Sequence, residues 1–210
     1  MLNRYARAFF TTLLTPIARL FLKLGISPDI VTVVGTLGVC IGALAFYPRH
    51  RFFVGTLVIT AFVFSDTIDG IMARQAGRSS NWGAYLDSTL DRVGDAAVFG
   101  GLVLWYAGDG DNNLMAALSL ACLILGSVVS YAKARAEGLG YTANVGIAER
   151  ADRLVAVLVT TGLVGLGLPE VVLLVVLALL ALASLVTVCQ RVLTVRKQAF
   201  ARAGEPHPTT

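Results

Sequence analysis

Residues 66–91 read DTIDGIMARQAGRSSNWGAYLDSTLD and place four carboxylates inside or beside apolar segments. Asp66 and Asp69 are three residues apart, and Asp87 and Asp91 are four apart, so each pair lies on one face of its own helix. An ionisable side chain at membrane depth is costly and is by default a functional group. Four carboxylates that converge on one point repel each other strongly, and divalent cations held by oxygen ligands offset that repulsion.

The rest of the chain has the composition of an integral membrane protein. Of its 210 residues, 56% are hydrophobic and only 14% are charged, and the mean hydropathy is +0.75. The uncharged runs that can cross or nearly cross a bilayer are residues 30–47, 112–132 and 171–190. We therefore predict an all-α fold, an integral membrane bundle of six transmembrane helices at about residues 29–47, 52–74, 83–106, 112–134, 152–168 and 171–191.

The two ends of the chain differ from this bundle. Residues 1–24 mix Arg and Lys with apolar residues that recur every three or four positions, which predicts an amphipathic juxtamembrane helix on the cytoplasmic surface. Residues 25–202 form the predicted membrane domain. The polar, proline-containing residues 203–210 are predicted to be a disordered tail.

The distribution of Lys and Arg predicts the orientation in the membrane. Only Arg49 and Arg51 lie on one side of the six-span arrangement, Arg92 lies within a span, and the other cations lie on the opposite side. The positive-inside rule then places both termini and the carboxylate end in the cytoplasm, in a multi-pass protein of the cell membrane. The net charge of +4 suits anionic lipids and substrates. Nucleic acid is not an expected partner, because there is no soluble basic domain.

The pattern D-x2-D-G-x2-A-R-x8-G-x3-D-x3-D resembles the signature of the CDP-alcohol phosphatidyltransferase family. Eight fixed positions at fixed spacings make this a highly specific pattern; they are Asp66, Asp69, Gly70, Ala73, Arg74, Gly83, Asp87 and Asp91. The resemblance implies an enzyme that transfers a phosphatidyl or similar group from a CDP-linked lipid to an alcohol and releases CMP.

Two other classes of protein are weighed against this interpretation. A transporter or channel that uses the carboxylates as an ion path predicts further polar residues in the other spans, which are nearly absent, and does not need Gly70, Ala73 and Gly83 at these offsets. A catalytically inactive scaffold that binds a CDP-lipid predicts a damaged motif, whereas the candidate ligands and base are all present.

Phosphoryl transfer needs charge neutralisation and in-line positioning, which two metal ions supply. The predicted ligands of two Mg²⁺ ions, with Mn²⁺ as an alternative, are Asp66, Asp69, Asp87 and Asp91. The family resemblance also implies that Asp91 is the general base for the acceptor hydroxyl. A role for Asp91 as a metal ligand alone is the alternative.

The nucleotide of the CDP-lipid is expected to lie against small residues on the two motif helices. Either the missing bulk lets the base and ribose approach the backbone, or it serves close helix packing. Arg74 reaches the nucleotide phosphate or orients a carboxylate. Asp29 either contacts the nucleotide or caps the first span. The full set of candidate nucleotide residues is Asp29, Thr32, Asp66, Gly70, Ala73, Arg74 and Gly83. Asp95 lies outside the motif and is expected to pair with a basic residue such as Arg92.

Several cations at the cytoplasmic ends of the last three spans could form a pocket for a phosphate dianion. The candidate residues are Ser130, Lys133, Arg135, Arg153 and Arg191, with Arg196 replacing the last if the final helix runs longer. Ordinary positive-inside flanking is the alternative. A phosphorylated acceptor needs such a pocket, whereas free inositol or serine does not.

The chain as a whole resembles one group within the family, the actinobacterial phosphatidylinositol phosphate synthases. The similarity is carried by residues 3–7, by Ser27 and Pro28, and by residues 131–138. It implies that CDP-diacylglycerol and inositol 1-phosphate give phosphatidylinositol phosphate and CMP, and that the protein is a homodimer. A phosphatidylglycerophosphate synthase, which uses glycerol 3-phosphate, is the closest alternative.

Overall fold

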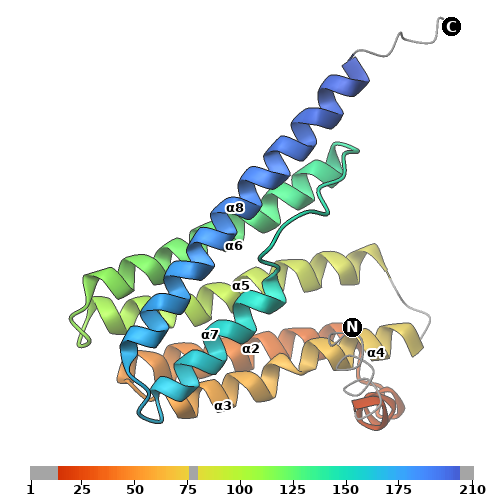
Figure 1. Ribbon diagram of the computed structural model, residues 1–210. Helices are drawn as coiled ribbons and strands as arrows, with labels where there is room; N and C mark the ends of the chain where they lie inside the picture. Colours follow the sequence, from red (N-terminus) through yellow and green to blue (C-terminus); the bar gives the residue numbers. More distant parts are fainter. Residues whose placement is uncertain (1–13, 76–79, 204–210) are drawn as a thin grey trace, which may run out of the picture.

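The structure is a computed structural model that describes residues 14–75 and 80–203, apart from the side chains of Asp66, Thr67 and Ala203. Every regular element in this part of the chain is a helix, so the predicted all-α class is confirmed (Figure 1). A helix over residues 14–23 precedes the labelled elements, which are α2 (Pro28–Phe46), the 3₁₀ helix η1 (Tyr47–Arg49), α3 (Phe52–Val63), α4 (Ser65–Gln75), α5 (Asn81–Ala107), α6 (Asn113–Gly138), α7 (Arg150–Val164) and α8 (Glu170–Ala203).

Polar caps determine where several of these helices begin. Ser27 Oγ accepts a hydrogen bond from Ile30 N at 3.3 Å, and Pro28 occupies the first turn of α2, where its missing N–H has no cost. Ser80 Oγ accepts from Gly83 N at 3.0 Å at the start of α5. Ser27 therefore caps α2, and the alternative in which Asp29 is the cap was wrong.

Four helical stretches in the described residues are long and apolar enough to cross a membrane: Pro28–Arg49, Phe52–Gln75, Asn113–Gly138 and Glu170–Arg202. The remaining predicted spans correspond to α5, which carries several charged residues, and to α7, which has only 15 residues. The chain is thus an all-helical protein with four clearly apolar spans, and the count of six stays a prediction.

Two predicted boundaries differ from the structure. The predicted span 52–74 consists of two helices, α3 and α4, which meet at Phe64. The predicted last span ends at residue 191, whereas α8 continues to Ala203. Hydropathy marks only the apolar part of a helix. The polar residues of α8 after residue 191 form hydrogen bonds with the segment between α6 and α7.

Helix α2 lies at the centre of the first half of the bundle, where it packs against α3, α4 and α5. Small residues allow these helices to come close. A Cβ atom on Gly38 would collide with the Phe62 ring of α3, and a Cβ atom on Gly101 of α5 would lie 2.9 Å from the backbone oxygen of Ala43. The apolar core around these contacts includes the fully buried Phe52.

The second half of the bundle is arranged around α6 and α8. Helix α6 packs against both α5 and α8, and α7 contacts both α3 and α8. Figure 1 shows α6 and α8 running side by side to the end of the molecule where α8 finishes. The helix over residues 14–23 packs separately, with Leu14 and Ala18 buried against Val31, Ile71 and Met72. Residues 1–13 of the predicted juxtamembrane helix lie outside the described residues.

Adjacent glycines on α5 offer a matched test of this packing. We expect Gly101→Ala to destabilise the protein by about 1–3 kcal/mol, because the backbone of Ala43 cannot move aside for the new methyl group. Gly100→Ala should be neutral or slightly stabilising, because no atom lies within 4 Å of a Cβ atom built there. Thermal unfolding of the two variants in detergent measures the difference, and equal melting temperatures would contradict the packing argument.

Candidate functional site

The motif residues lie at one end of the bundle, where α4 ends and α5 begins (Figure 1). Both helices pack on α2, whose own first residues lie at this end. Asp69 lies on α4, and Asp87 and Asp91 lie one turn apart on α5. The fold therefore brings the predicted nucleotide and metal residues of three different helices to the same end.

A buried hydrogen bond links α2 and α4 within this group. Thr32 Oγ1 lies 2.6 Å from Asp69 Oδ2 and donates to it, and each residue is only 7% exposed. A carboxylate buried among apolar residues needs such a donor or a cation to offset its lost hydration. A predicted nucleotide residue and a predicted metal ligand are thus in direct contact.

A second contact links the first turns of α2 and α5. Trp82 Nε1 donates a hydrogen bond to Asp29 Oδ2 at 3.1 Å, and the Trp82 ring stacks on that of Tyr85 with centroids 6.0 Å apart. Both aromatic side chains are exposed. Asp29 therefore contacts the first turn of the helix that carries Asp87 and Asp91.

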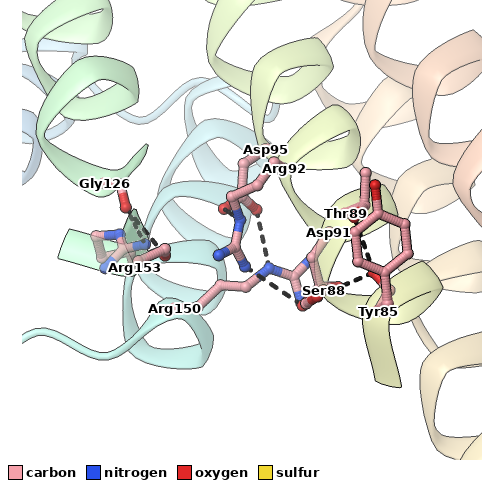
Figure 2. A network of polar contacts seen from close by, with 10 residues as sticks. Tyr85, Ser88, Thr89, Asp91, Arg92, Asp95, Gly126, Arg150 and Arg153 are labelled. Carbon is pink, nitrogen blue, oxygen red and sulfur yellow. Dashed lines mark hydrogen bonds and ion pairs between the residues drawn. The ribbon is translucent and has the colours of Figure 1, made fainter. Parts of the chain in front are cut away.

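Arg150, at the start of α7, bridges two carboxylates of α5 (Figure 2). Its Nη1 atom lies 2.7 Å from Asp91 Oδ1, and its Nε atom lies 3.1 Å from Asp95 Oδ1. Arg92 makes longer contacts, 3.4 Å to Asp91 Oδ2 and 4.0 Å to Asp95 Oδ2. The predicted pairing of Asp95 with Arg92 is confirmed, but Arg150 is the closer partner.

Asp91 and Arg150 also line a pocket between α2, α3, α5 and α7. The open space within its lining, including the mouth, is about 300 Å³. The remaining lining residues are Thr36, Val39, Val63, Leu90, Gly94 and Leu154. Its enclosed volume is only about 10 Å³, which is room for about one water molecule, so these residues line a narrow gap in this structure.

The small motif residues leave open surface rather than tight packing. Among the described atoms, a Cβ atom on Gly70 would meet only the guanidinium of Arg74, at 3.5 Å, and one on Gly83 would meet only Ser80 Oγ, at 3.4 Å. Neither glycine contacts another helix in this way. Of the two interpretations, this geometry favours approach of a ligand to the backbone. Ala73 is half-buried on α4, and Asp87 is exposed on α5 one turn before Asp91.

The donor set of this end suits a hard divalent cation. Among the described side chains, which do not include that of Asp66, no three His, Cys, Asp or Glu side chains gather closely enough to hold a metal ion. The candidate donors are nevertheless all carboxylate oxygens, the ligands that Mg²⁺ and Mn²⁺ prefer. Asp69 and Asp91 lie on helices that flank α2 at the same end. The chemical type of the donors therefore suits the predicted metal, and the four-ligand set stays a prediction.

Two residues of the predicted phosphate pocket converge on one backbone oxygen of α6. Arg153 is 2% exposed, and its Nη2 atom lies 3.5 Å from Gly126 O, to which Ser130 Oγ donates at 3.1 Å. Its Nη1 atom donates to Ala148 O at 3.0 Å. A Cβ atom on Gly126 would lie 3.2 Å from the Arg153 guanidinium, so this glycine makes room for the cation.

The other predicted pocket cations are arranged differently. Arg191 is buried, donates to Val145 O at 3.0 Å, and also donates to Val129 O beside Ser130. Lys133 lies 3.9 Å from Glu137 one turn later on α6, and Arg135, two residues after Lys133, is exposed on a different face of the helix. Arg196 is the predicted substitute for Arg191 if the last helix runs longer. Helix α8 does run longer, but Arg196 is exposed, and its guanidinium lies 5.5 Å from the centroid of the Phe200 ring. Ser130, Arg153 and Arg191 thus all bind backbone oxygens of the same part of α6, whereas Lys133, Arg135 and Arg196 do not join them in these contacts.

Sequence reasoning did not assign Arg150 or Trp82 to the site. Arg150 is one of several cations near the start of the predicted fifth span, and nothing in the nearby sequence distinguishes its role from that of Arg153. Trp82 lies within the spacer of the motif, where the signature fixes no residue. Both assignments depend on which helices face each other.

Comparisons with known proteins agree on one family. Residues 25–150 match the family model described as CDP-alcohol phosphatidyltransferase. The chain is 58% identical over 205 residues to the phosphatidylinositol phosphate synthase of Streptomyces avermitilis, an alignment that covers 95% of this chain and 84% of the relative.

Solved structures give the same result. The crystal structure of Mycobacterium tuberculosis phosphatidylinositol phosphate synthase with CDP-DAG bound is similar with a TM-score of 0.84 and 41% identity, covering 88% of this chain and 94% of that one. The structure of the same enzyme in complex with manganese and citrate gives a TM-score of 0.81 and 42% identity, covering 87% and 88%.

The two arginines beside Asp91 and Asp95 should differ in their effect on stability. We expect Arg150→Gln to lower the free energy of unfolding by about 1–3 kcal/mol, because it leaves two largely buried carboxylates without their closest cation. Arg92→Gln should cost less than about 1 kcal/mol, because its contacts are longer. Thermal unfolding compares the two, and a larger loss for Arg92→Gln would reverse the assignment.

Proposed function

Because the chain belongs to the CDP-alcohol phosphatidyltransferase family, we propose that it transfers the phosphatidyl group of CDP-diacylglycerol to inositol 1-phosphate, giving phosphatidylinositol phosphate and CMP. The observation that carries this proposal is the 58% identity to a phosphatidylinositol phosphate synthase along 95% of the chain. The solved structures support the donor, since the relative with a TM-score of 0.84 holds CDP-DAG.

The enzyme lies in the cell membrane as a homodimer. Six spans cross the bilayer, with α3 and α4 forming one of them, and the membrane domain covers residues 25–202. The juxtamembrane helix includes residues 14–23, and the burial of Leu14 and Ala18 against α2 and α4 supports its place beside the membrane domain. Residues 1–13 of this predicted helix and residues 204–210 of the predicted tail lie outside the described residues. Both termini and the carboxylate end face the cytoplasm, where a water-soluble acceptor and CMP can exchange.

Two divalent cations, Mg²⁺ or alternatively Mn²⁺, are held by Asp66, Asp69, Asp87 and Asp91. The manganese complex of the Mycobacterium tuberculosis relative supports a divalent cation. When bound, such ions neutralise the pyrophosphate and the charge that develops on the leaving CMP. Thr32 holds Asp69 in place through the 2.6 Å hydrogen bond, which lowers the cost of ordering the ligand.

The cytidine nucleotide lies at the cytoplasmic end of α2, α4 and α5. Its binding residues are Asp29, Thr32, Asp66, Gly70, Ala73, Arg74 and Gly83. The open surface beside Gly70 and Gly83 supports close approach of the nucleotide to the backbone. Arg74, beside Gly70, offers a cation to a phosphate oxygen.

Asp91 accepts the proton of the acceptor hydroxyl. Its carboxylate lies on the wall of the pocket, and Arg150 and Arg92 each contact a different oxygen of it. These two contacts restrict the orientation of the carboxylate, which a general base needs for proton transfer at hydrogen-bond distance.

The phosphate of the acceptor is held by Ser130, Lys133, Arg135, Arg153 and Arg191. Arg153 and Arg191 are already fixed by backbone carbonyl groups, so their positive charges are in place before the acceptor arrives. Both guanidinium groups are buried, and among the described residues no carboxylate forms a salt bridge with either. Such burial is costly, and a phosphate dianion offsets that cost.

The acceptor preference can be tested by CMP release from purified protein with CDP-diacylglycerol and Mg²⁺. We expect turnover with inositol 1-phosphate, and at most weak turnover with glycerol 3-phosphate, free inositol or serine, each offered alone. Turnover mainly with glycerol 3-phosphate would move the enzyme to phosphatidylglycerophosphate synthesis. A neutral acceptor would contradict the phosphate pocket, and the absence of CMP with all four would contradict the enzymatic function.

Asp91→Asn tests the base. Asparagine has a similar shape but cannot take the proton, so turnover should fall by at least about a hundredfold while CDP-diacylglycerol binding is largely kept. Binding is measured separately, by isothermal titration in detergent. Full activity of this variant would exclude Asp91 as the base, and loss of binding together with turnover would assign it to metal or substrate binding alone.

A further inference from the structure

The segment between α6 and α7, residues 139–149, lies along α8. We call it the strap. It has almost no regular secondary structure, yet Ala143 and Ala148 within it are buried. Figure 1 shows it running beside the part of α8 that extends past the predicted membrane span. An irregular segment must satisfy its backbone groups outside itself, so the partners of the strap decide where it lies.

Side chains from one face of α8 supply those partners. They are Thr187, Arg191, Gln198 and Arg202, at intervals of four, seven and four residues, which is the spacing of a single helix face. The polar continuation of α8 beyond residue 191 therefore has a contact surface of its own.

The outer part of the strap is held by Gln198 and Arg202. Gln198 Oε1 accepts from Thr142 N at 3.0 Å, and Gln198 Nε2 donates to Thr142 O at 2.6 Å. Arg202 Nη2 donates to Gly140 O at 2.6 Å, and its guanidinium lies 4.5 Å from the centroid of the Tyr141 ring. One side chain thus binds both backbone groups of Thr142, as a neighbouring β-strand would.

The inner part of the strap is held by Thr187 and Arg191. Thr187 Oγ1 accepts from Ile147 N and from Ala148 N, each at 3.2 Å, and Arg191 Nε donates to Val145 O at 3.0 Å. Gly146 has φ +146°, and a Cβ atom there would collide with the methyl group of Thr187. Only glycine therefore lets the strap come this close to α8.

The contacts follow one antiparallel register. Going forward along the strap, the partners on α8 go backward: residue 140 pairs with 202, residue 142 with 198, residue 145 with 191, and residues 147 and 148 with 187. From 202 to 187 a helix rises about 22 Å, at 1.5 Å per residue. From 140 to 148 a nearly extended chain covers about 26 Å, at about 3.3 Å per residue. The two lengths agree closely enough for the strap to follow α8 along this whole distance.

The inner end of the strap leads directly to the acceptor pocket. The N–H group of Ala148 is bound by Thr187 of α8, and its carbonyl group accepts from Arg153 of α7. Val145 O is bound by Arg191. The next residues after the strap are those of the α7 start, including Arg150, which contacts Asp91. The strap therefore connects the far end of α8 with three cations of the site.

We infer that this face of α8 sets the position of the strap, and through it the position of Arg150 and Arg153 at the acceptor site. Gln198 and Arg202 are then positioning residues for acceptor binding, far along the chain from the signature motif. The inference rests on the proposed function, because it assigns the acceptor phosphate to Arg153.

The test compares Gln198→Ala and Arg202→Ala with Lys197→Ala, a neighbouring exposed residue of α8. We expect the first two variants to raise the KM for inositol 1-phosphate by about three- to tenfold, the range for the loss of one or two hydrogen bonds. The KM for CDP-diacylglycerol and kcat should change less than about twofold, and Lys197→Ala should resemble the wild type. Arg202→Lys, which keeps a cation beside Tyr141, should recover part of the loss.

Hydrogen–deuterium exchange of the same purified variants provides a readout that does not depend on activity. Faster exchange of residues 140–148 in Gln198→Ala and Arg202→Ala, but not in Lys197→Ala, supports the inference when it accompanies the change in KM. Unchanged exchange, an unchanged KM for the acceptor, or an equal fall in kcat for all three variants would overturn it. If the wild type uses glycerol 3-phosphate instead, the proposed function fails, and the same comparison with that acceptor still decides the role of the strap.

Discussion

The need to pair charges inside an apolar helix bundle is the constraint on which the rest of this structure depends. Asp91 and Asp95 lie on one face of α5, and their cost in a membrane domain is offset by Arg150, which reaches them from α7. This bridge joins helices that are distant in sequence and places a carboxylate and a guanidinium on the wall of one pocket. Asp69 follows the same rule with a different partner, the hydroxyl group of Thr32.

Close packing around α2 makes these pairings possible. Glycines on α2 and α5 let α3, α4 and α5 approach the same central helix, so that α4 and α5 present their motif faces at one end. The chain uses its glycines in two distinct ways. The space beside Gly38 and Gly101 is filled by a neighbouring helix, whereas the surface beside Gly70 and Gly83 stays open among the described atoms.

The buried cations of the proposed acceptor site are held by backbone carbonyl groups. Arg153 and Arg191 donate to carbonyl groups of α6 and of the strap, and this fixes their guanidinium groups while their charge is not cancelled by a paired anion within these contacts. Such an arrangement suits recognition of a phosphate dianion, since little ordering remains to be done on binding. It also makes the pocket dependent on the strap and hence on the polar end of α8, which lies outside the signature motif.

The sequence by itself determined the all-α membrane class, the family and the end of the bundle at which the carboxylates lie. Hydropathy, helical spacing and the eight motif positions are local properties, and they can be read without knowing which helices meet. It could not determine the pairing of Arg150 with Asp91, the contact of Trp82 with Asp29, the length of α8 or the binding of Arg191 to carbonyl groups of α6 and the strap. These side-chain contacts join residues between 46 and 62 positions apart, and they depend on the order in which helices pack and on the faces they turn to each other. Only the tertiary structure decides those, because many packings of the same amphipathic or apolar helices would satisfy the same local pattern.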